Sequence, residues 1–271
     1  MTFSKWQKGV VLPEIIYKYC SGNTGLIILN NRELKMSVAN KVNDEFESTH
    51  GGYRNVDINV IKRDLQNQLY PIAKSQHIFS GDYLEWSMYI NNLTKEQLKE
   101  IQNELSKPNK EQRKRFQEQV ASEICFSCFS KYPNLNNMFE RYADKNRGIS
   151  IGFDTHYMPD VGKVDYSNEP PSMPFLELGS DFISPDTENE IVRNILFTKS
   201  LESKDWRDEE EWRIVKRKKE CINRDGAYFW NFPIEAIKEI YIAPQMLKCD
   251  KIAFSTLVHM QYPHIKLFET H

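Results

Sequence analysis

The sequence predicts an α+β fold, with a mixed or mostly antiparallel central sheet, flanking helices and a helical insertion, in one domain over residues 1–271. Short apolar runs of strand length recur between turn-forming residues, and the helical stretches gather in one region instead of alternating with the strands. Hydrophobic residues make up 40% of the chain and aromatic residues 12%, which is enough for a sizeable core. The length of 271 residues fits a single elaborated domain.

The N-terminal region is predicted to run strand, helix, strand and loop. Ile15–Tyr19 is β-branched and aromatic, and it ends before the turn-forming segment Ser21–Asn23. A short helix is expected next, and Leu34–Ser37 then alternates between apolar and polar residues as a second strand does.

Residues 56–120 change in character and are predicted to be a helical insertion. Residues 94–119 are mostly Lys, Glu, Gln and Asn. Leu98, Ile101 and Leu105 form one narrow apolar stripe at helical spacing. The basic stretch Lys110–Arg115 is expected to be a solvated helix face, since a nucleic-acid footprint needs a wider cluster.

Strands resume after the insertion. Ile124–Ser130 and Gly148–Phe153 are predicted strands, with a short helix within Leu135–Lys145 between them. The proline-rich segment Asn168–Pro185 is expected to be a loop, either a surface linker or a lid. Ile191–Leu201 has a helical pattern.

The C-terminal part is predicted to add three further strands. Trp212–Lys216 is a strand, the segments Lys216–Lys219 and Asn223–Gly226 form a turn region, and Ala227–Phe232 is the returning strand. Ile237–Ile242 supplies another apolar strand.

Charge and composition exclude several classes of protein. The 36 Lys and Arg residues against 38 Asp and Glu leave a net charge of −2, so there is no overall positive field for nucleic acid or an anionic membrane. The N-terminus lacks an apolar segment long enough for a signal peptide, and no later stretch is long enough for a membrane span. We therefore expect a cytoplasmic protein without a membrane partner.

The cysteines are expected to be reduced thiols. There are five of them, an odd number that does not suggest a disulfide framework. Cys125 and Cys128 have C-x-x-C spacing, but no second pair or nearby His completes a zinc site. Buried strand cysteines are the better interpretation, and no metal is predicted.

The common catalytic signatures are missing, including phosphate-binding loops, G-x-G-x-x-G, G-x-S-x-G and H-E-x-x-H. Three polar constellations remain. In the first, alternation places Lys18 on the strand face opposite Tyr17 and Tyr19. Lys18 either binds an anionic or ribose-bearing ligand or keeps its ammonium group in water along an apolar surface.

The second constellation is Asn43–Glu47, which a helix N-cap explains without function. The third is Asp205–Arg213, with five acids in seven residues. In an extended run Glu209 and Glu211 share one face, which makes an E-x-E pair entering a strand. The alternative is an acidic turn neutralised by nearby Lys and Arg side chains.

At these residues the sequence resembles a bacterial family, number 2971 in the series of domains of unknown function. Three blocks carry the resemblance. They are Ile16–Tyr19 with Asn31–Ser37 and Asn43–Glu47; Cys125–Ser127 with Met138–Asp144 and Gly148–Asp154; and Trp206 with Glu209, Glu211, Trp212 and Arg213. The chain departs from the family pattern at several positions, chiefly at Arg141, where the family has His.

The order of these blocks is also similar to that of ADP-ribosyltransferases. In that family the first strand supplies a basic or His residue to the active site, the middle strand supplies Ser or Tyr, and the last motif is a glutamate, often E-x-E. That resemblance implies an ADP-ribosyltransferase-like fold and NAD as substrate. Carried onto this sequence, it assigns those places to Lys18, to Ser127 or Tyr142, and to Glu211.

The resemblance implies a mechanism in which a carboxylate stabilises the positive charge that develops on ribose as the nicotinamide bond breaks. Glu211 is the candidate, with Glu209 positioning or deprotonating the acceptor. Lys18 would contact the phosphate or ribose, and a tyrosine would stack on nicotinamide. The remaining assigned binding residues are Tyr17, Tyr19, Tyr142, Ser127 and Arg213.

Two other functions stay open. The chain could be a nucleotide-binding regulatory module, with Lys18, Arg141 and Arg213 gripping phosphate. It could also be a metal-dependent nuclease that uses Asp44, Glu47 and Glu211. A toxin or phage-defence setting, with a protein or nucleic-acid acceptor, agrees with the family resemblance.

Overall fold

The computed structural model describes residues 10–41, 53–54, 58–67, 69–75, 77–106, 110–168, 171, 173–174, 195–201 and 206–270. The chain divides into two compact units, and each is described by itself. The first unit comprises residues 1–45, 121–166 and 201–271, and the second comprises residues 46–120 and 167–200. The predicted α+β class with a mixed central sheet is confirmed.

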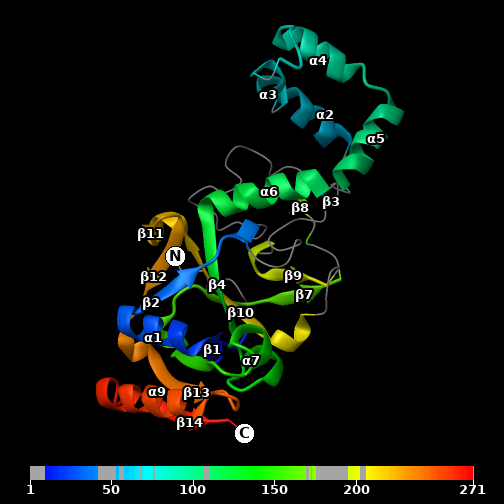
Figure 1. Cartoon of the computed structure of the whole chain (residues 1–271). Helices are drawn as coiled ribbons and strands as arrows, with labels where there is room; N and C mark the ends of the chain where they lie inside the picture. Colours follow the sequence, from blue (N-terminus) through cyan, green and yellow to red (C-terminus); the bar gives the residue numbers. More distant parts are fainter. Residues whose placement is uncertain are drawn as a thin grey trace. The chain divides into compact units, whose positions relative to one another are not determined.

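The first unit is built on a seven-stranded sheet with the order β14-β13-β5-β1-β4-β10-β6 (Figure 1). Its strands are β1 (Ile15–Cys20), β4 (Ile124–Ser130), β5 (Ile149–Asp154), β6 (Val161–Lys163), β10 (Glu211–Arg217), β13 (Ile237–Ile242) and β14 (Lys266–Glu269). Neighbouring strands are antiparallel except β13 and β14, which are parallel and are connected through helix α9 (Lys248–Gln261). A parallel pair needs such a crossover connection, which explains why the sheet is mixed.

The sheet is weakly joined at its centre. β1 pairs with β5 along its whole length, and β4 pairs with β10 along its whole length, but β1 and β4 pair only at Tyr17 and Ser130. Beyond that point the edge of β4 bonds to another segment, because Ser37 and Phe126 exchange backbone hydrogen bonds of 2.7 and 2.8 Å. β4 is therefore bonded to β10 along one edge, and to β1 and the segment at Ser37 along the other.

Strand register sorts the side chains onto two faces of this sheet. Ser130 is opposite both Tyr17 and Glu211, so these three side chains share one face, which we call the Glu211 face. Lys18 and Ser127 are each an odd number of residues away along uninterrupted strands, so they lie on the opposite face, which we call the Lys18 face.

Helices cover both faces. α7 (Asn136–Tyr142) packs on the Glu211 face, where Met138 and Phe139 join a buried cluster with Tyr17 and Tyr19. α1 (Gly22–Asn31) lies on the Lys18 face, where Gly25 approaches Ile149 and Cys20 closely. The Ser21 hydroxyl accepts a hydrogen bond from the Thr24 amide at the N-cap of α1, so the predicted turn Ser21–Asn23 is the cap and first residues of this helix.

A second sheet of the first unit has the order β11-β12-β2. Its strands are β2 (Glu33–Met36), β11 (Ile222–Arg224) and β12 (Ala227–Asn231). Asp225 and Gly226 both have positive φ in the turn between β11 and β12, as tight hairpins require. The predicted turn region therefore contains a strand, and β12 returns against β11 and β2, not against β10.

The second unit contains the predicted helical region. Its elements are β3 (Tyr53–Arg54), α2 (Ile58–Asn67), α3 (Leu69–Ser75), α4 (Tyr83–Asn91), α5 (Lys95–Ser106), α6 (Lys110–Glu123), β8 (Met173–Pro174) and β9 (Thr198–Ser200), while β7 (Asp165–Ser167) lies at its boundary. Six buried residues form a core in this unit: Ile61, Leu65, Ala73, Trp86, Ile90 and Leu98. The Trp86 indole donates to the Leu65 carbonyl at 2.8 Å, which satisfies its buried N–H.

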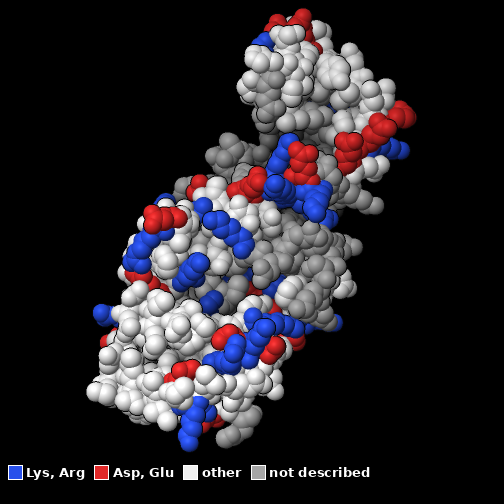
Figure 2. All heavy atoms as spheres, in the orientation of Figure 1, with Lys and Arg blue, Asp and Glu red and all other residues white. Residues whose placement is uncertain are grey.

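Two expectations about this region can be judged. Most of the basic stretch of α6 is solvated as predicted: Lys114 and Arg115 are exposed and pair with Glu118 and Glu111 one turn away, and basic and acidic side chains adjoin over α6 in Figure 2. Arg113 is half-buried. The helix expected over Ile191–Leu201 is wrong at its end, because Thr198–Ser200 forms β9. Strand pairing there outweighs a weak local helix propensity.

Candidate functional site

The E-x-E pair lies where the chain turns into β10. Arg207–Glu209 form a 3₁₀ turn, and Glu210 takes a left-handed conformation with φ 43°. Glu209 and Glu211 are 3% and 2% exposed, whereas Glu210 is half-buried. The segment is thus not the extended run that the sequence suggests, yet the turn still buries Glu209 and Glu211 and leaves Glu210 between them half-buried.

Glu209 is held by α7. Its carboxylate accepts a hydrogen bond of 2.7 Å from the Tyr142 hydroxyl and one of 3.3 Å from the Arg141 guanidinium. Arg141 also binds both carboxylate oxygens of Asp208, at 3.1 and 2.7 Å. The hydrogen bond to Asp208 is the main reason that the pKa of Arg141 is raised above its usual value. Arg141 therefore carries an ion pair with Asp208.

Glu211 is fixed by a second cation. The Arg213 Nε donates to its carboxylate at 2.7 Å, and the guanidinium lies over the Phe126 ring at 4.9 Å from the centroid. Arg213 is 0% exposed, so this is a fully buried ion pair. The backbone N–H of Glu211 donates to the Tyr166 hydroxyl at 2.9 Å.

Lys18 and Ser127 come together, as predicted for two residues of one site, but on the Lys18 face. The Lys18 Nζ donates to the Ser127 Oγ at 3.0 Å and to the Cys128 carbonyl at 2.9 Å. Lys18 also lies 5.5 Å from the centroid of the Phe129 ring.

Tyr17 and Tyr19 lie under α7. The Tyr17 hydroxyl donates to Glu239 at 2.7 Å, and the Tyr19 hydroxyl donates to the Tyr132 carbonyl at 2.7 Å and accepts from the Leu135 amide at 2.9 Å. Burial is the main cause of the raised pKa of each tyrosine. These contacts fix the entry to α7.

The structure therefore brings the sequence-predicted residues together in two sets. Glu209 and Tyr142 are in direct contact at the turn into β10, and Glu211 and Arg213 follow on the same strand. Lys18 and Ser127 form the other set, and the register does not bring them to the face of Glu211. A single cleft lined by Lys18, Ser127, Tyr142 and Glu211 is accordingly not formed. Asp44 and Glu47 lie outside the described residues.

Sequence reasoning did not find the links of Arg141 to Asp208 and of Tyr17 to Glu239. The two members of each pair are 67 and 222 residues apart. The sequence shows no sign of either link beyond a charged residue without an obvious role, Glu239 in an apolar strand and Asp208 in an acidic segment.

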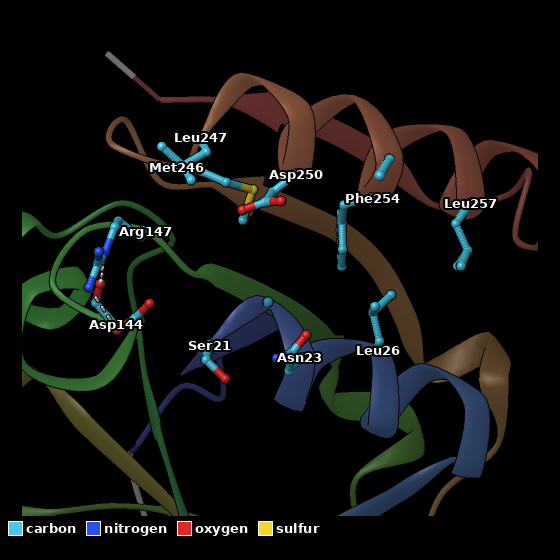
Figure 3. A pocket seen from close by; sticks show the side chains of 12 residues that line it. Ser21, Asn23, Leu26, Asp144, Arg147, Met246, Leu247, Asp250, Phe254 and Leu257 are labelled. Atoms are coloured by element: carbon cyan, nitrogen blue, oxygen red, sulfur yellow. Dashed lines mark hydrogen bonds and ion pairs between the residues drawn. The ribbon is translucent and has the colours of Figure 1, made fainter.

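A separate cavity of about 340 Å³ opens between α1 and α9 (Figure 3). Leu26, Phe254 and Leu257 form its apolar wall, and the ion pair of Asp144 and Arg147, 3.3 Å long, lies at its edge. None of the residues predicted from the sequence lines it.

Two further observations bear on the chemistry. In the described ranges, no group of three or more His, Cys, Asp and Glu side chains is arranged to hold a metal ion. No helix in the same ranges combines the length and apolar character needed to cross a bilayer.

Comparisons with protein-family models, with curated proteins and with solved structures found no match. The resemblance to family 2971 and to ADP-ribosyltransferases therefore remains a prediction, and function is argued from the residues of the site.

Proposed function

We propose that this chain binds NAD and cleaves or transfers at the nicotinamide–ribose bond, with Glu211 and Glu209 as its carboxylates. One observation carries the proposal. Both glutamates of the E-x-E motif are buried at the entry to β10, and each is held in one orientation by a cation, with Tyr142 adding a hydrogen bond to Glu209.

A fixed carboxylate suits this reaction because positive charge develops on the ribose as nicotinamide leaves. Groups whose orientation is set beforehand stabilise such charge without reorganising during the step. Three described carboxylates, of Asp208, Glu209 and Glu211, meet two guanidinium groups, of Arg141 and Arg213.

Tyr142 supplies the aromatic surface. Its side chain is partly exposed while its hydroxyl binds Glu209, so the ring is anchored and still accessible. An anchored ring of this kind can stack against nicotinamide. Glu209 beside it would position the acceptor nucleophile, which we expect to be a group of a protein or nucleic acid, or water.

The proposal differs from the one based on sequence in the role of Lys18 and Ser127. Because they bond to each other on the Lys18 face, we assign them to joining β1 and β4, not to contact with NAD. Arg213 is assigned to positioning Glu211. A toxin or phage-defence role remains part of the proposal, carried by the family resemblance alone.

The test is the release of nicotinamide from NAD, followed by chromatography, by the wild type, by Glu211→Gln and by Glu210→Gln. Glu210 is the matched control, because it is adjacent and more exposed than the buried pair. Gln at position 211 keeps an oxygen that can accept from Arg213, and a urea unfolding curve checks that the variant is folded. We expect Glu211→Gln to lose about 100-fold or more in rate and Glu210→Gln to retain activity.

The outcomes separate the candidate functions. Binding of NAD in calorimetry without release of nicotinamide, with a range of protein and nucleic-acid acceptors present, would indicate a nucleotide-binding regulatory module. Equal rates for wild type and Glu211→Gln would remove Glu211 from the mechanism. Activity that requires a divalent cation and is lost in chelator would favour the nuclease.

A further inference from the structure

Two cysteine sulfurs from distant parts of the first unit are in contact. Cys125 lies in β4, and Cys221 follows the 3₁₀ turn Lys218–Glu220 before β11. Their Sγ atoms are 3.6 Å apart although the residues are 96 positions apart in the chain. A disulfide has an S–S length of about 2.05 Å, so the two sulfurs would approach by about 1.5 Å to form one.

The C-x-x-C spacing of Cys125 and Cys128 does not produce a pair. The two residues are three positions apart in an uninterrupted strand, so their side chains point to opposite faces. The partner of Cys125 comes instead from a segment that strand pairing brings alongside β4, because Cys125 is opposite Lys216 of β10 and the chain turns back shortly after it.

The two thiols differ in access and in charge. Cys125 is completely buried, whereas Cys221 is partly exposed, so an oxidant from solvent reaches Cys221 first. The hydrogen bond between the two sulfurs is the main cause of a lowered pKa at Cys221, against burial and the Glu220 carboxylate, which raise it. The same hydrogen bond, together with burial, raises the pKa of Cys125. The proton thus stays on the inner sulfur and the negative charge develops on the outer one.

We propose that Cys221 and Cys125 form a redox-active pair that closes to a disulfide when the protein meets a hydroperoxide. The Cys221 thiolate attacks the outer peroxide oxygen, the O–O bond breaks, and a sulfenic acid forms as hydroxide or alkoxide leaves. The Cys125 thiol then attacks the sulfenic sulfur, the S–O bond breaks, and water leaves. Two thiols are oxidised by two electrons, and one peroxide is reduced to two hydroxyl-bearing products.

The pair lies at the end of the β4–β10 ladder away from the turn into β10, because Cys125 is opposite Lys216 whereas Glu211 is opposite Ser130. The disulfide would close a covalent loop that contains α7 and the E-x-E segment. It would also fix the start of β4 to the residue that precedes β11. This inference does not depend on the proposed reaction with NAD.

Two of the remaining cysteines, Cys20 and Cys249, supply controls. Cys20 is buried, and burial raises the pKa of its thiol to about 12, which disfavours the reactive thiolate. Cys249 is exposed, and its Sγ lies 3.6 Å from the Asp250 carboxylate. Cys249 therefore reports oxidation by simple access.

The experiment treats the full chain with hydrogen peroxide, blocks the remaining thiols with N-ethylmaleimide, and maps non-reduced peptides by mass spectrometry. We expect an intramolecular Cys125–Cys221 peptide that dithiothreitol reverses, in the wild type and equally in Cys249→Ser. In Cys125→Ser the sulfenic acid at Cys221 should persist and react with dimedone. In Cys221→Ser, Cys125 should remain unoxidised.

Two results would overturn the proposal. In the first, Cys125 and Cys221 both remain open to alkylation in unfolded samples of peroxide-treated wild type while Cys249 is oxidised. In the second, Cys221 is oxidised beyond sulfenic acid at the same rate in the wild type and in Cys125→Ser. Because Cys221 is at the surface, Cys221→Ser provides the comparison if Cys125→Ser does not fold.

Discussion

Replacing Gly148 by Ala should destabilise the first unit more than any other glycine substitution described here. Gly148 precedes β5, and a Cβ atom at this position would overlap the carbonyl oxygen of Cys20 and lie 2.8 Å from that of Ala143. The Gly148 N–H donates to the same Ala143 carbonyl at 2.7 Å, so the backbone is already held at closest approach. The obstruction is backbone, which cannot rotate away as a side chain can.

The magnitude follows from what must move. Overpacking that side chains can absorb costs about 1–3 kcal/mol. Here relief requires separating the start of β5 from β1, or from the end of α7, so we expect a loss of about 3 kcal/mol or more. The reduced entropy of the unfolded chain offsets only about 0.4–1 kcal/mol of this.

The assay is urea unfolding followed by far-ultraviolet circular dichroism, with two matched glycine variants. In Gly25→Ala the nearest atom is the flexible end of Ile149, so the cost should be smaller. In Gly226→Ala no atom lies within 4 Å, and only the φ of +79° opposes the change, which costs about 1 kcal/mol. A Gly148→Ala variant as stable as Gly226→Ala would refute this reasoning. Because Ala143 follows Tyr142, the same variant should also impair the candidate site.

Three other predictions concern stability. Burial, and then the hydrogen bond to the Glu239 carboxylate, raise the pKa of Tyr17 above its usual 10.0, so the stability that protonated Tyr17 contributes is complete below pH 10 and is lost as the pH rises further. Tyr17→Phe should therefore flatten the alkaline part of a plot of unfolding free energy against pH. An unchanged plot would contradict this. The hydrogen bonds from Arg224 lower the pKa of Glu33 below 4.5, so the stability that ionised Glu33 contributes is present above that pH and is lost on acidification. Arg224→Gln should therefore reduce the loss of thermal stability at acidic pH, measured by melts at successive pH values. Trp86→Ala removes a buried ring and its hydrogen bond and should lower the free energy of unfolding of the second unit by about 3–5 kcal/mol. Faster hydrogen exchange in α2 and α4 would measure this loss, while exchange in β4 and β10 should not change.

Much of the fold could be predicted from local pattern. β1, β4, β5, β10 and β13 lie where apolar or alternating runs predict strands, because such runs bury a side chain at every second position or at every position. The helical region over residues 56–120 is likewise visible in its composition. The partners of the strands were not visible, and β12 pairs with β2, nearly 200 residues away in sequence, at Trp230 and Leu34.

The candidate site was predicted in part. The burial of Glu209 and Glu211 agrees with the E-x-E interpretation, although a left-handed Glu210 produces it instead of an extended strand. The grouping of Lys18 and Ser127 with Glu211 required knowledge of register, since an odd offset along β4 moves a side chain to the other face. No local pattern contains that information.

The sequence by itself determined the class of fold and the positions of most strands. It also identified charged residues and cysteines as candidates for a functional role. It could do so because hydrophobic periodicity and turn chemistry act over a few residues. Only the tertiary structure decided which of those residues meet: Tyr142 with Glu209, Lys18 with Ser127, and Cys125 with Cys221. These contacts depend on strand order and register, which are set by packing between segments far apart in the chain.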